Sequence, residues 1–233
     1  MTSKYIAHFL EQVSTWQQKL SVTDQVISIY MQVQRTWMHL ESIFIGSEDI
    51  RKQLPEDTDR FERVDNNFKE IASEMSVTKI VVDACNQPRL YDRLDSIQKE
   101  LVKCEKALAE YLETKRLAFP RFYFVSSADL LDILSNGNNP PVVAKQLTKL
   151  FDSLANLEIA KGDPPMAHAM FSKEGERIKL EHVCDLSGQV EVWLNRVEDD
   201  MKATIRKEMS EAVASYEEKP REKWIFDYPA QVM

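Results

Sequence analysis

The stretch PRLYDRLDSIQKELVKCEKALAEYLETKRLA, residues 88–118, is the most regular part of the chain and decides its fold class. Its apolar residues recur in alternating steps of four and three, which is the spacing of a coiled-coil or bundle-facing helix. This seam consists of Leu90, Leu94, Ile97, Leu101, Cys104, Leu108 and Tyr111. A helix with one apolar stripe needs a partner to bury it, and the earlier helices of the same chain are the nearest candidates. We interpret the seam as internal packing first and as an intermolecular zipper second.

The sequence before this seam is also helical in its periodicity. Apolar residues follow one another at helical spacing from Ile6 to Phe44, which predicts one long helix or two helices joined near Ser21. Gly46 supplies a stop signal, and Pro55 can open a further helix with one apolar face. We therefore expect residues 1–118 to form a helical bundle.

The pattern changes at Phe119. Residues 121–125, RFYFV, are aromatic and β-branched, and Pro120 disfavours helix in the residue before it, so we predict a short strand here. The aromatic side chains of this segment could form a ligand platform, but a strand with alternate sides in the core explains them more simply. Ser126 then caps a helix.

Two apolar segments near the middle of the C-terminal half predict a β-hairpin. Residues 167–171 and 177–183 flank the turn sequence Lys173-Glu174-Gly175-Glu176, and the second segment alternates apolar with polar side chains. A last long helix is expected to begin at Ser187 or Gly188 and to end before Pro220. The predicted organisation is therefore mainly α, with three parts at 1–118, 119–186 and 187–233.

Composition excludes several classes of protein. The 233 residues are 43% hydrophobic, which argues against disorder, and three cysteines without a C-x-x-C pair favour buried free thiols over a disulfide scaffold. The net charge of −8, with acids and bases interspersed, opposes binding to nucleic acid or to an anionic membrane. No apolar run approaches the length of a membrane span.

Chemical motifs are also missing from the sequence. None of the five glycines belongs to a phosphate-binding loop, so we expect no nucleotide cofactor in this chain. The four histidines include no H-E-x-x-H, and His182 with Cys184 lacks the further ligands of a zinc site. Carboxylate pairs such as Asp199 and Asp200 lie beside basic residues and are typical of a solvated face. We predict no catalytic, cofactor or metal-binding residues.

The segment Phe119–Ser135, FPRFYFVSSADLLDILS, closely resembles the FPRFYF…DLLDIL segment of dynein heavy chains, which lies in the linker before the AAA+ ring. Further segments resemble the family in the same order, at residues 37–50, 54–61, 171–176 and 224–232. Details at 54–57, 135–138 and 226–229 are more similar to axonemal, outer-arm dyneins than to cytoplasmic transport motors. Walker loops, stalk and microtubule-binding domain are missing, so the chain resembles an excised middle part of the linker.

The resemblance implies a mechanical function. In dyneins the linker is a rod of helical bundles with a β-hairpin; ATP binding and hydrolysis in the ring bend and straighten it, and straightening is the power stroke of a minus-end-directed microtubule motor. ATP and Mg²⁺ would belong to the parent ring, which would be this chain's direct partner. Microtubules and the intermediate and light chains would be reached only through the parent complex. The implied location is the cytoplasm and cytoskeleton, in the axoneme of a cilium or flagellum.

Two sets of residues take roles from the resemblance. The motif residues are expected to hold the shape of the linker; they are Phe119, Pro120, Arg121, Phe122, Tyr123, Phe124, Asp129 and Leu130. The hairpin residues are expected to contact insertions of the ring when the linker is bent; they are Phe171, Lys173, Glu174, Gly175 and Glu176. The alternative is a self-standing helical adaptor whose seams recruit partner helices, although no repeat of fixed period is present. An enzyme is a distant third.

Overall fold

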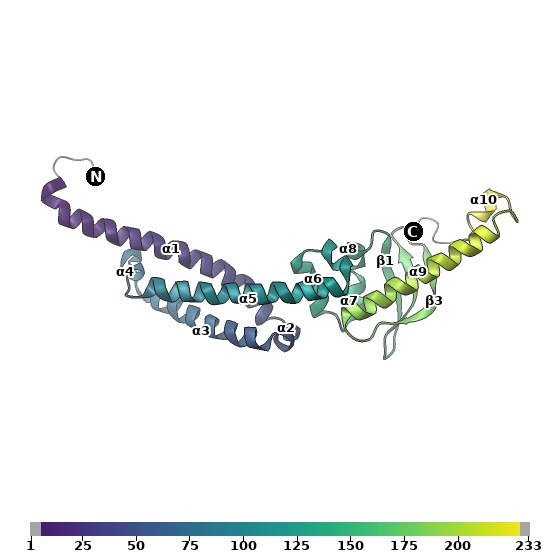
Figure 1. The fold of residues 1–233 in the computed structure, drawn as a ribbon, viewed down its shortest axis with the longest axis horizontal. Coiled ribbons are helices and arrows are strands. Elements are labelled where there is room, and N and C mark those ends of the chain that lie inside the picture. Colours follow the sequence, from purple (N-terminus) through teal and green to yellow (C-terminus); the bar gives the residue numbers. More distant parts are fainter. Residues whose placement is uncertain (1–5, 229–233) are drawn as a thin grey trace. The chain divides into compact units, whose positions relative to one another are not determined.

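The structure, a computed structural model, describes residues 6–228 (Figure 1). It is mainly helical and contains one three-stranded antiparallel sheet, which confirms the fold class. The chain divides into two compact units, the first ending at Glu110 and the second beginning at Tyr111. The predicted three-part division at 118 and 186 stays a prediction.

The first unit is built from helices. In chain order these are η1 (Ile6–Phe9), α1 (Leu10–Phe44), α2 (Glu48–Gln53), α3 (Pro55–Val77), α4 (Val81–Cys85) and the greater part of α5 (Leu90–Ala118). The long apolar pattern at the start is therefore one helix without a break near Ser21. Pro55 occupies the first turn of α3, where its missing N–H costs nothing.

The seam of α5 lies in the core of the first unit. Leu94 and Cys104 are completely inaccessible to solvent, and Leu90, Ile97, Leu101 and Leu108 are buried as well. Tyr111 is only half-buried, whereas the next residue, Leu112, is buried. A helix with 3.6 residues per turn drifts away from a strict seven-residue repeat, which accounts for this change. The seam is thus internal packing, as expected.

The second unit contains the aromatic motif, the sheet and the last long helix. Its elements are η2 (Pro120–Phe124), α6 (Ser127–Ser135), α7 (Pro140–Ala144), α8 (Leu147–Leu150), β1 (Leu154–Ala160), β2 (Met166–Ser172), β3 (Arg177–Asp185), α9 (Val190–Ala214) and α10 (Arg221–Trp224). The last turns of α5 also belong to this unit. The long helix begins at Val190, after the N-cap residue Gln189, slightly later than predicted.

The prediction of a strand at residues 121–125 is wrong, because this segment is the 3-10 helix η2. Pro120 fixes the backbone of the first turn, and the N–H of Phe122 donates to the carbonyl of Phe119 at 3.0 Å. Side chains three residues apart lie on the same side of a 3-10 helix, so Phe119 and Phe122 point into the core together. A strand would have placed them on opposite faces.

The predicted hairpin is confirmed as β2 and β3, and the sheet has one more strand than expected. Strand β1 pairs with the other edge of β2, which gives the antiparallel order β1-β2-β3. Helix α9 packs against β3 and provides the second layer of the unit (Figure 1). The end of the family-like segment 224–232 lies outside the described residues.

Candidate functional site: a clamp on the last long helix

The aromatic motif forms the centre of the second unit. Phe119, Phe122 and Leu130 are completely buried, and the first two rings meet edge to face with their centroids 5.0 Å apart. Phe119 also approaches Phe151, whose ring centroid is 6.4 Å away. Edge-to-face aromatic pairs add about 0.5–1.5 kcal/mol beyond their buried area. These side chains therefore fix the position of η2 within the unit.

Arg121 connects this centre to α9. Its Nε donates to Glu198 Oε2 at 3.0 Å, its guanidinium lies 4.4 Å from the centre of the Phe151 ring, and its Nη1 donates to the carbonyl of Leu150. Burial raises the pKa of Glu198, but hydrogen bonds from Lys202 and Arg121 outweigh burial and leave the pKa below its usual value. The carboxylate is therefore charged at neutral pH, and one arginine joins η2, the end of α8 and α9.

A second ion pair joins the end of α5 to the start of α9. Lys115 Nζ lies 2.5 Å from Glu191 Oε1, and only 13% and 7% of the two side chains are exposed. Glu191 lies in the first turn of α9, where the helix dipole favours a negative charge. One turn further along α9, Asn195 donates to the carbonyl of Ala118 at 3.0 Å, which completes the attachment of the α5 terminus.

On the side of α9 opposite the two ion pairs, the backbone at Gly137 lies close against the helix. The indole Nε1 of the fully buried Trp193 donates to the carbonyl of Gly137 at 3.2 Å. A Cβ atom at Gly137 would lie only 3.2 Å from the Cβ of Val190, so any larger residue here requires Val190 to move by a few tenths of an ångström. We call these three attachments of α9, through Glu191, Trp193 and Glu198, the α9 clamp.

The remaining motif residues lie at the surface. Tyr123 is 53% exposed and donates its hydroxyl to Glu113 at 2.5 Å; this hydrogen bond raises the pKa of the phenol. Phe124 is 73% exposed and contributes nothing to the core. The N–H of Asp129 donates to Oγ of the N-cap residue Ser126, and the hydrogen bond from Lys149 at 2.7 Å lowers the pKa of the Asp129 carboxyl. Pro120 initiates η2.

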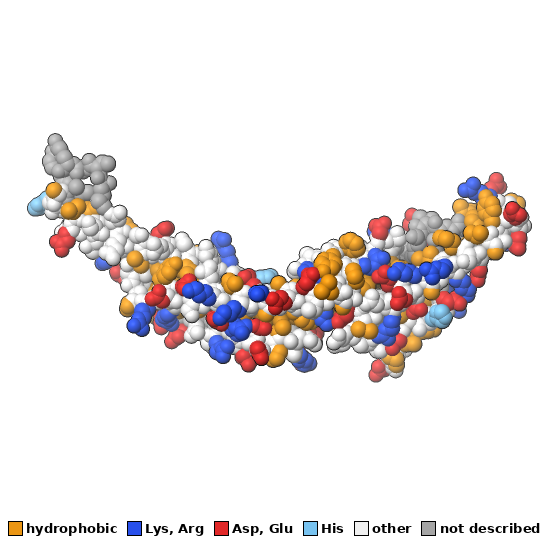
Figure 2. Space-filling model, viewed as in Figure 1, with side chains coloured by type: hydrophobic (Ala, Val, Ile, Leu, Met, Phe, Trp, Pro, Cys, Tyr) orange, Lys and Arg blue, Asp and Glu red, His pale blue; other side chains and the backbone are white. Residues whose placement is uncertain are grey.

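The hairpin turn presents charged side chains to solvent. Lys173, Glu174 and Gly175 are exposed, whereas Phe171 and Glu176 are half-buried. Gly175 has a positive φ of 85°, which glycine adopts without strain. The N–H of Glu176 donates to Ser172 Oγ at 3.0 Å and closes the turn. Figure 2 shows acidic and basic side chains interspersed over the visible face of the molecule.

Strand β3 is attached to α9 through a bulge. Ala169 of β2 pairs with Lys179 of β3, and the next pair joins Ala167 to Cys184. Between these two pairs β2 advances by two residues and β3 by five. Within the bulge the N–H of Glu181 donates to Oγ1 of Thr204 on α9, at 2.9 Å. Thr204 is only 2% exposed, so this backbone donor has its partner in a dry environment. The carboxylate of Glu181 also pairs with Lys207 at 2.5 Å.

Among the described residues, no group of three or more His, Cys, Asp or Glu side chains could hold a metal ion. No helix within residues 6–228 is both long and apolar enough to cross a membrane. Cys85, Cys104 and Cys184 are buried free thiols, as predicted. Burial raises the pKa of Cys104 to about 11 and that of Cys184 to about 12.

The sequence singles out Arg121 but not its partner Glu198 on α9, nor the pair of Lys115 and Glu191. Lys115 and Glu191 are 76 residues apart in the chain, and one sequence contains no signal that pairs two such residues. One feature of the sequence does point to Glu191. It is an acidic residue at the start of a predicted helix, and apolar residues that prove to be buried, Val190 and Trp193, lie on either side of it.

Comparison with known proteins identifies the family of this mainly helical chain. The family model described as dynein heavy chain, N-terminal region 2, matches residues 1–212. The chain belongs to the dynein heavy chain family. It is 65% identical to a ciliary dynein beta chain of Tripneustes gratilla and 63% identical to dynein axonemal heavy chain 17 of Mus musculus. It is 49% identical to the flagellar outer-arm dynein beta chain of Chlamydomonas reinhardtii.

The alignments cover 100% of this chain for the first two relatives and 96% for the third. The chain spans only 5% of the length of each of these relatives. It thus corresponds to a small region of proteins that are much longer.

Proposed function

We propose that this chain is a force-transmitting segment of the linker of an axonemal dynein heavy chain, an ATP-driven motor that moves cilia or flagella. The family match over residues 1–212 supports the linker assignment, and the printed names of the relatives support a ciliary or flagellar axoneme. In this function the parent AAA+ ring binds ATP and Mg²⁺ and hydrolyses ATP. This chain receives the motion of the ring and passes it on as the power stroke toward minus-end-directed movement on microtubules.

The observation that carries the mechanical role is the α9 clamp. A segment that transmits force must deform little under load, and close-packed interiors with satisfied polar contacts transmit strain well. Lys115 and Arg121 fasten the α5 terminus and η2 to two successive parts of α9, while Trp193 fastens the opposite side to Gly137. Loosening one contact should therefore weaken mechanical coupling without touching a nucleotide site.

The test is a full-length motor with a loosened clamp. Glu191→Ala leaves Lys115 without its partner, so we expect near-normal ATPase activity of the ring but severalfold slower microtubule gliding when the motor is attached by its tail. The matched control is Lys115→Met with Glu191→Leu, which replaces the ion pair by apolar contact and should keep gliding intact. Equal loss of ATPase and gliding in Glu191→Ala would assign the clamp to hydrolysis rather than to force.

The hairpin turn is the proposed contact with the parent ring in the bent state. Lys173 and Glu174 are exposed charges on a turn closed by its own hydrogen bonds. Lys173 makes only a surface ion pair with Asp152 at 3.5 Å, so both charges are available to a partner without unfolding. In the full-length motor, Glu174→Lys should change the rate of the ATP-driven bending step. Asp199→Lys, the same charge change at an exposed position of α9, should not. Equal effects of both variants would assign the change to net charge alone.

Two further expectations follow from this proposal. Calorimetric titration of the 233-residue chain with MgATP should show no saturable heat, because the nucleotide sites belong to the ring. An antibody raised against this chain should label ciliary or flagellar axonemes. Micromolar binding of MgATP, or labelling restricted to the cell body, would contradict the respective part of the proposal.

A further inference from the structure

Helix α1 has two apolar faces rather than one. The first face lies in the core of its unit; its buried residues are Val26, Ile29, Val33, Leu40, Ile43 and Phe44. The second face, which we call the outer stripe, begins just before α1 and ends just after it. It consists of Phe9, Val13, Trp16, Leu20, Ile27, Met31, Met38 and Ile45.

The outer stripe is not an extension of the core-facing side. At about 100° per residue, the mean directions of the two sets differ by about 150° around the helix axis. Residues of the stripe recur in steps of three, four or seven, which is the period of a continuous helical face. A helix that is apolar on opposite sides is typical of a middle layer, which packs on two partners.

Only one of these two partners is present among the described residues. Seven residues of the outer stripe are between 38% and 58% exposed, the largest values being 56% for Trp16 and 58% for Met38. By contrast, the large apolar side chains exposed on α5 are the scattered Tyr91, Val102 and Leu117. Scattered apolar residues are normal at a surface, whereas an aligned set of seven exposed ones marks an interaction site.

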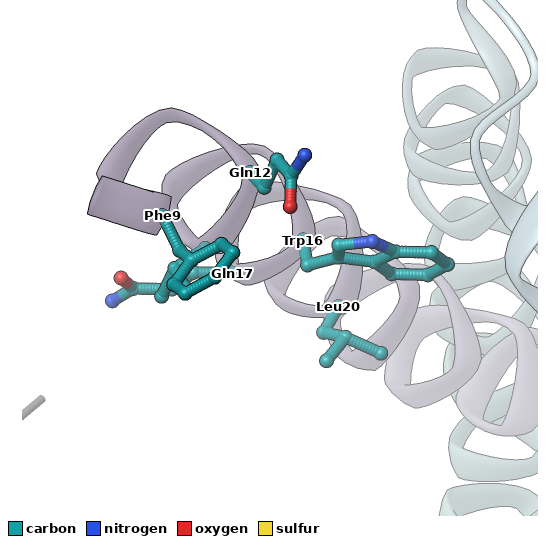
Figure 3. Close-up of a pocket in the computed structure, with 6 residues that line it drawn as sticks. Phe9, Gln12, Trp16, Gln17 and Leu20 are labelled. Atoms are coloured by element: carbon teal, nitrogen blue, oxygen red, sulfur yellow. The ribbon is translucent and has the colours of Figure 1, made fainter. Parts of the chain in front are cut away.

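The stripe is uninterrupted at the N-terminal end of α1. Phe9, Val13, Trp16 and Leu20 follow in steps of four, three and four, and Figure 3 shows three of these side chains along the first turns of the helix. Together with Gln12 and Gln17 they line a shallow hollow that contains no charged side chain. Further along, polar residues such as Asp24 and Gln34 occupy the corresponding positions.

We propose that the outer stripe is a docking face for a helix of the same heavy chain, located in the region that precedes residue 1. The family model that matches this chain describes the second N-terminal region of dynein heavy chains, and this chain spans only 5% of the length of a relative such as the ciliary dynein beta chain of Tripneustes gratilla. Heavy chains of the family therefore have polypeptide that precedes the matched region. That polypeptide joins the chain at the end where the stripe is uninterrupted. A tethered helix has a high effective concentration, so it occupies the face ahead of a free partner.

The chemistry of the face specifies its occupant. A stripe of about 36 residues is about 54 Å long, so it accommodates a long helix that returns antiparallel to α1. The hollow around Trp16 is uncharged, so the occupant presents apolar side chains at a three- or four-residue spacing there. This places α1 between two helical layers and does not depend on the power-stroke function.

Methionine oxidation tests the proposal at two positions of the stripe. Hydrogen peroxide converts an exposed thioether to its sulfoxide, and peptide mass spectrometry gives the rate for Met31 and Met38 separately. Three proteins are compared: the 233-residue chain, a version extended by the preceding region of the heavy chain, and the complete heavy chain. Ser28→Met, at an exposed position beside the stripe and off both faces, is the matched reporter.

We expect Met31 and Met38 to react at least about 10-fold more slowly in the extended and complete chains, while the Ser28→Met reporter changes much less. Unchanged rates in all three proteins would overturn the docking face. Protection that appears only in the complete heavy chain would place the occupant elsewhere and overturn the proposal. Protection in the 233-residue chain that disappears on dilution would identify a second copy as the occupant, which also contradicts it.

Discussion

Breaking the ion pair between Lys115 and Glu191 should destabilise the second unit strongly, whereas replacing both residues should not. Their charged atoms lie 2.5 Å apart and are largely shielded from water. Removing one partner of a buried pair costs about 3–5 kcal/mol, because the other charge is left without compensation. Glu191→Ala should therefore lose about this amount, and Lys115→Met a similar amount. The double replacement Lys115→Met with Glu191→Leu should stay within about 1 kcal/mol of the wild type.

The buried cysteines provide an assay for each unit separately. Cys184 lies in the second unit, and Cys104 lies in the first, so each thiol becomes reactive only when its own surroundings open. Labelling under native conditions, resolved by mass spectrometry, reports the free energy of that opening. A loss of about 3–5 kcal/mol accelerates the labelling of Cys184 by at least about 100-fold, since each 1.4 kcal/mol is a factor of ten.

Cys104 is the internal control in this experiment. Its labelling rate should be the same in the wild type, Glu191→Ala and the double variant, because the changes lie in the other unit. If Glu191→Ala alters the labelling of Cys184 by less than about fivefold, roughly 1 kcal/mol, the pair behaves like an ordinary surface salt bridge. The reasoning that makes this pair a central part of the α9 clamp would then be refuted.

Three further changes have expected outcomes. Gly137→Val should cost about 1–3 kcal/mol in urea unfolding, because the new Cβ lies 3.2 Å from that of Val190; an unchanged midpoint would show that α9 can shift freely. Thr204→Val, which leaves the N–H of Glu181 without its acceptor, should cost about 1–3 kcal/mol, whereas Thr204→Ser should keep most of the stability; equal losses would assign the effect to packing. Because burial raises the pKa of Cys104 to about 11, from an ordinary value of 9.0, this thiol adds stability that is complete below pH 9 and is lost as the pH rises toward 11. Stability that does not fall over this interval would contradict the burial of the thiol.

Much of the fold follows from local sequence patterns. The spacing of the α5 seam and the proline at the start of α3 each depend on residues within one element, and both predictions agree with the structure. The predicted alternation in β3 holds for Ile178 and Leu180 but fails at His182, which lies exposed in the bulge. The error at residues 121–125 has the opposite cause. Aromatic residues favour strands on average, but here Phe119 and Phe122 both enter one core, and that packing selects a 3-10 turn.

The α9 clamp and the two-sided nature of α1 could not be predicted from local patterns. Arg121 meets Glu198 across 77 residues of sequence, and this pairing depends on the assembled fold. In α1 the apolar pattern changes phase between Leu20 and Val22, which is also the pattern of two helices joined near Ser21. The structure shows that the change of phase is instead a change from one side of a continuous helix to the other.

Because of its bulge, β3 contains more backbone than the part of β2 with which it pairs. Over the same part of the ladder β3 has three residues more than β2, which corresponds to about 10 Å of extra backbone when extended. We therefore expect a pull on the turn to load β2 first, because β3 can lengthen by opening its bulge. The hydrogen bond from the N–H of Glu181 to Thr204 attaches the bulge to α9, and the side chain of Leu180 next to it is buried. We expect the two strands of this hairpin to take up tension one after the other, β2 first and β3 once its bulge has opened.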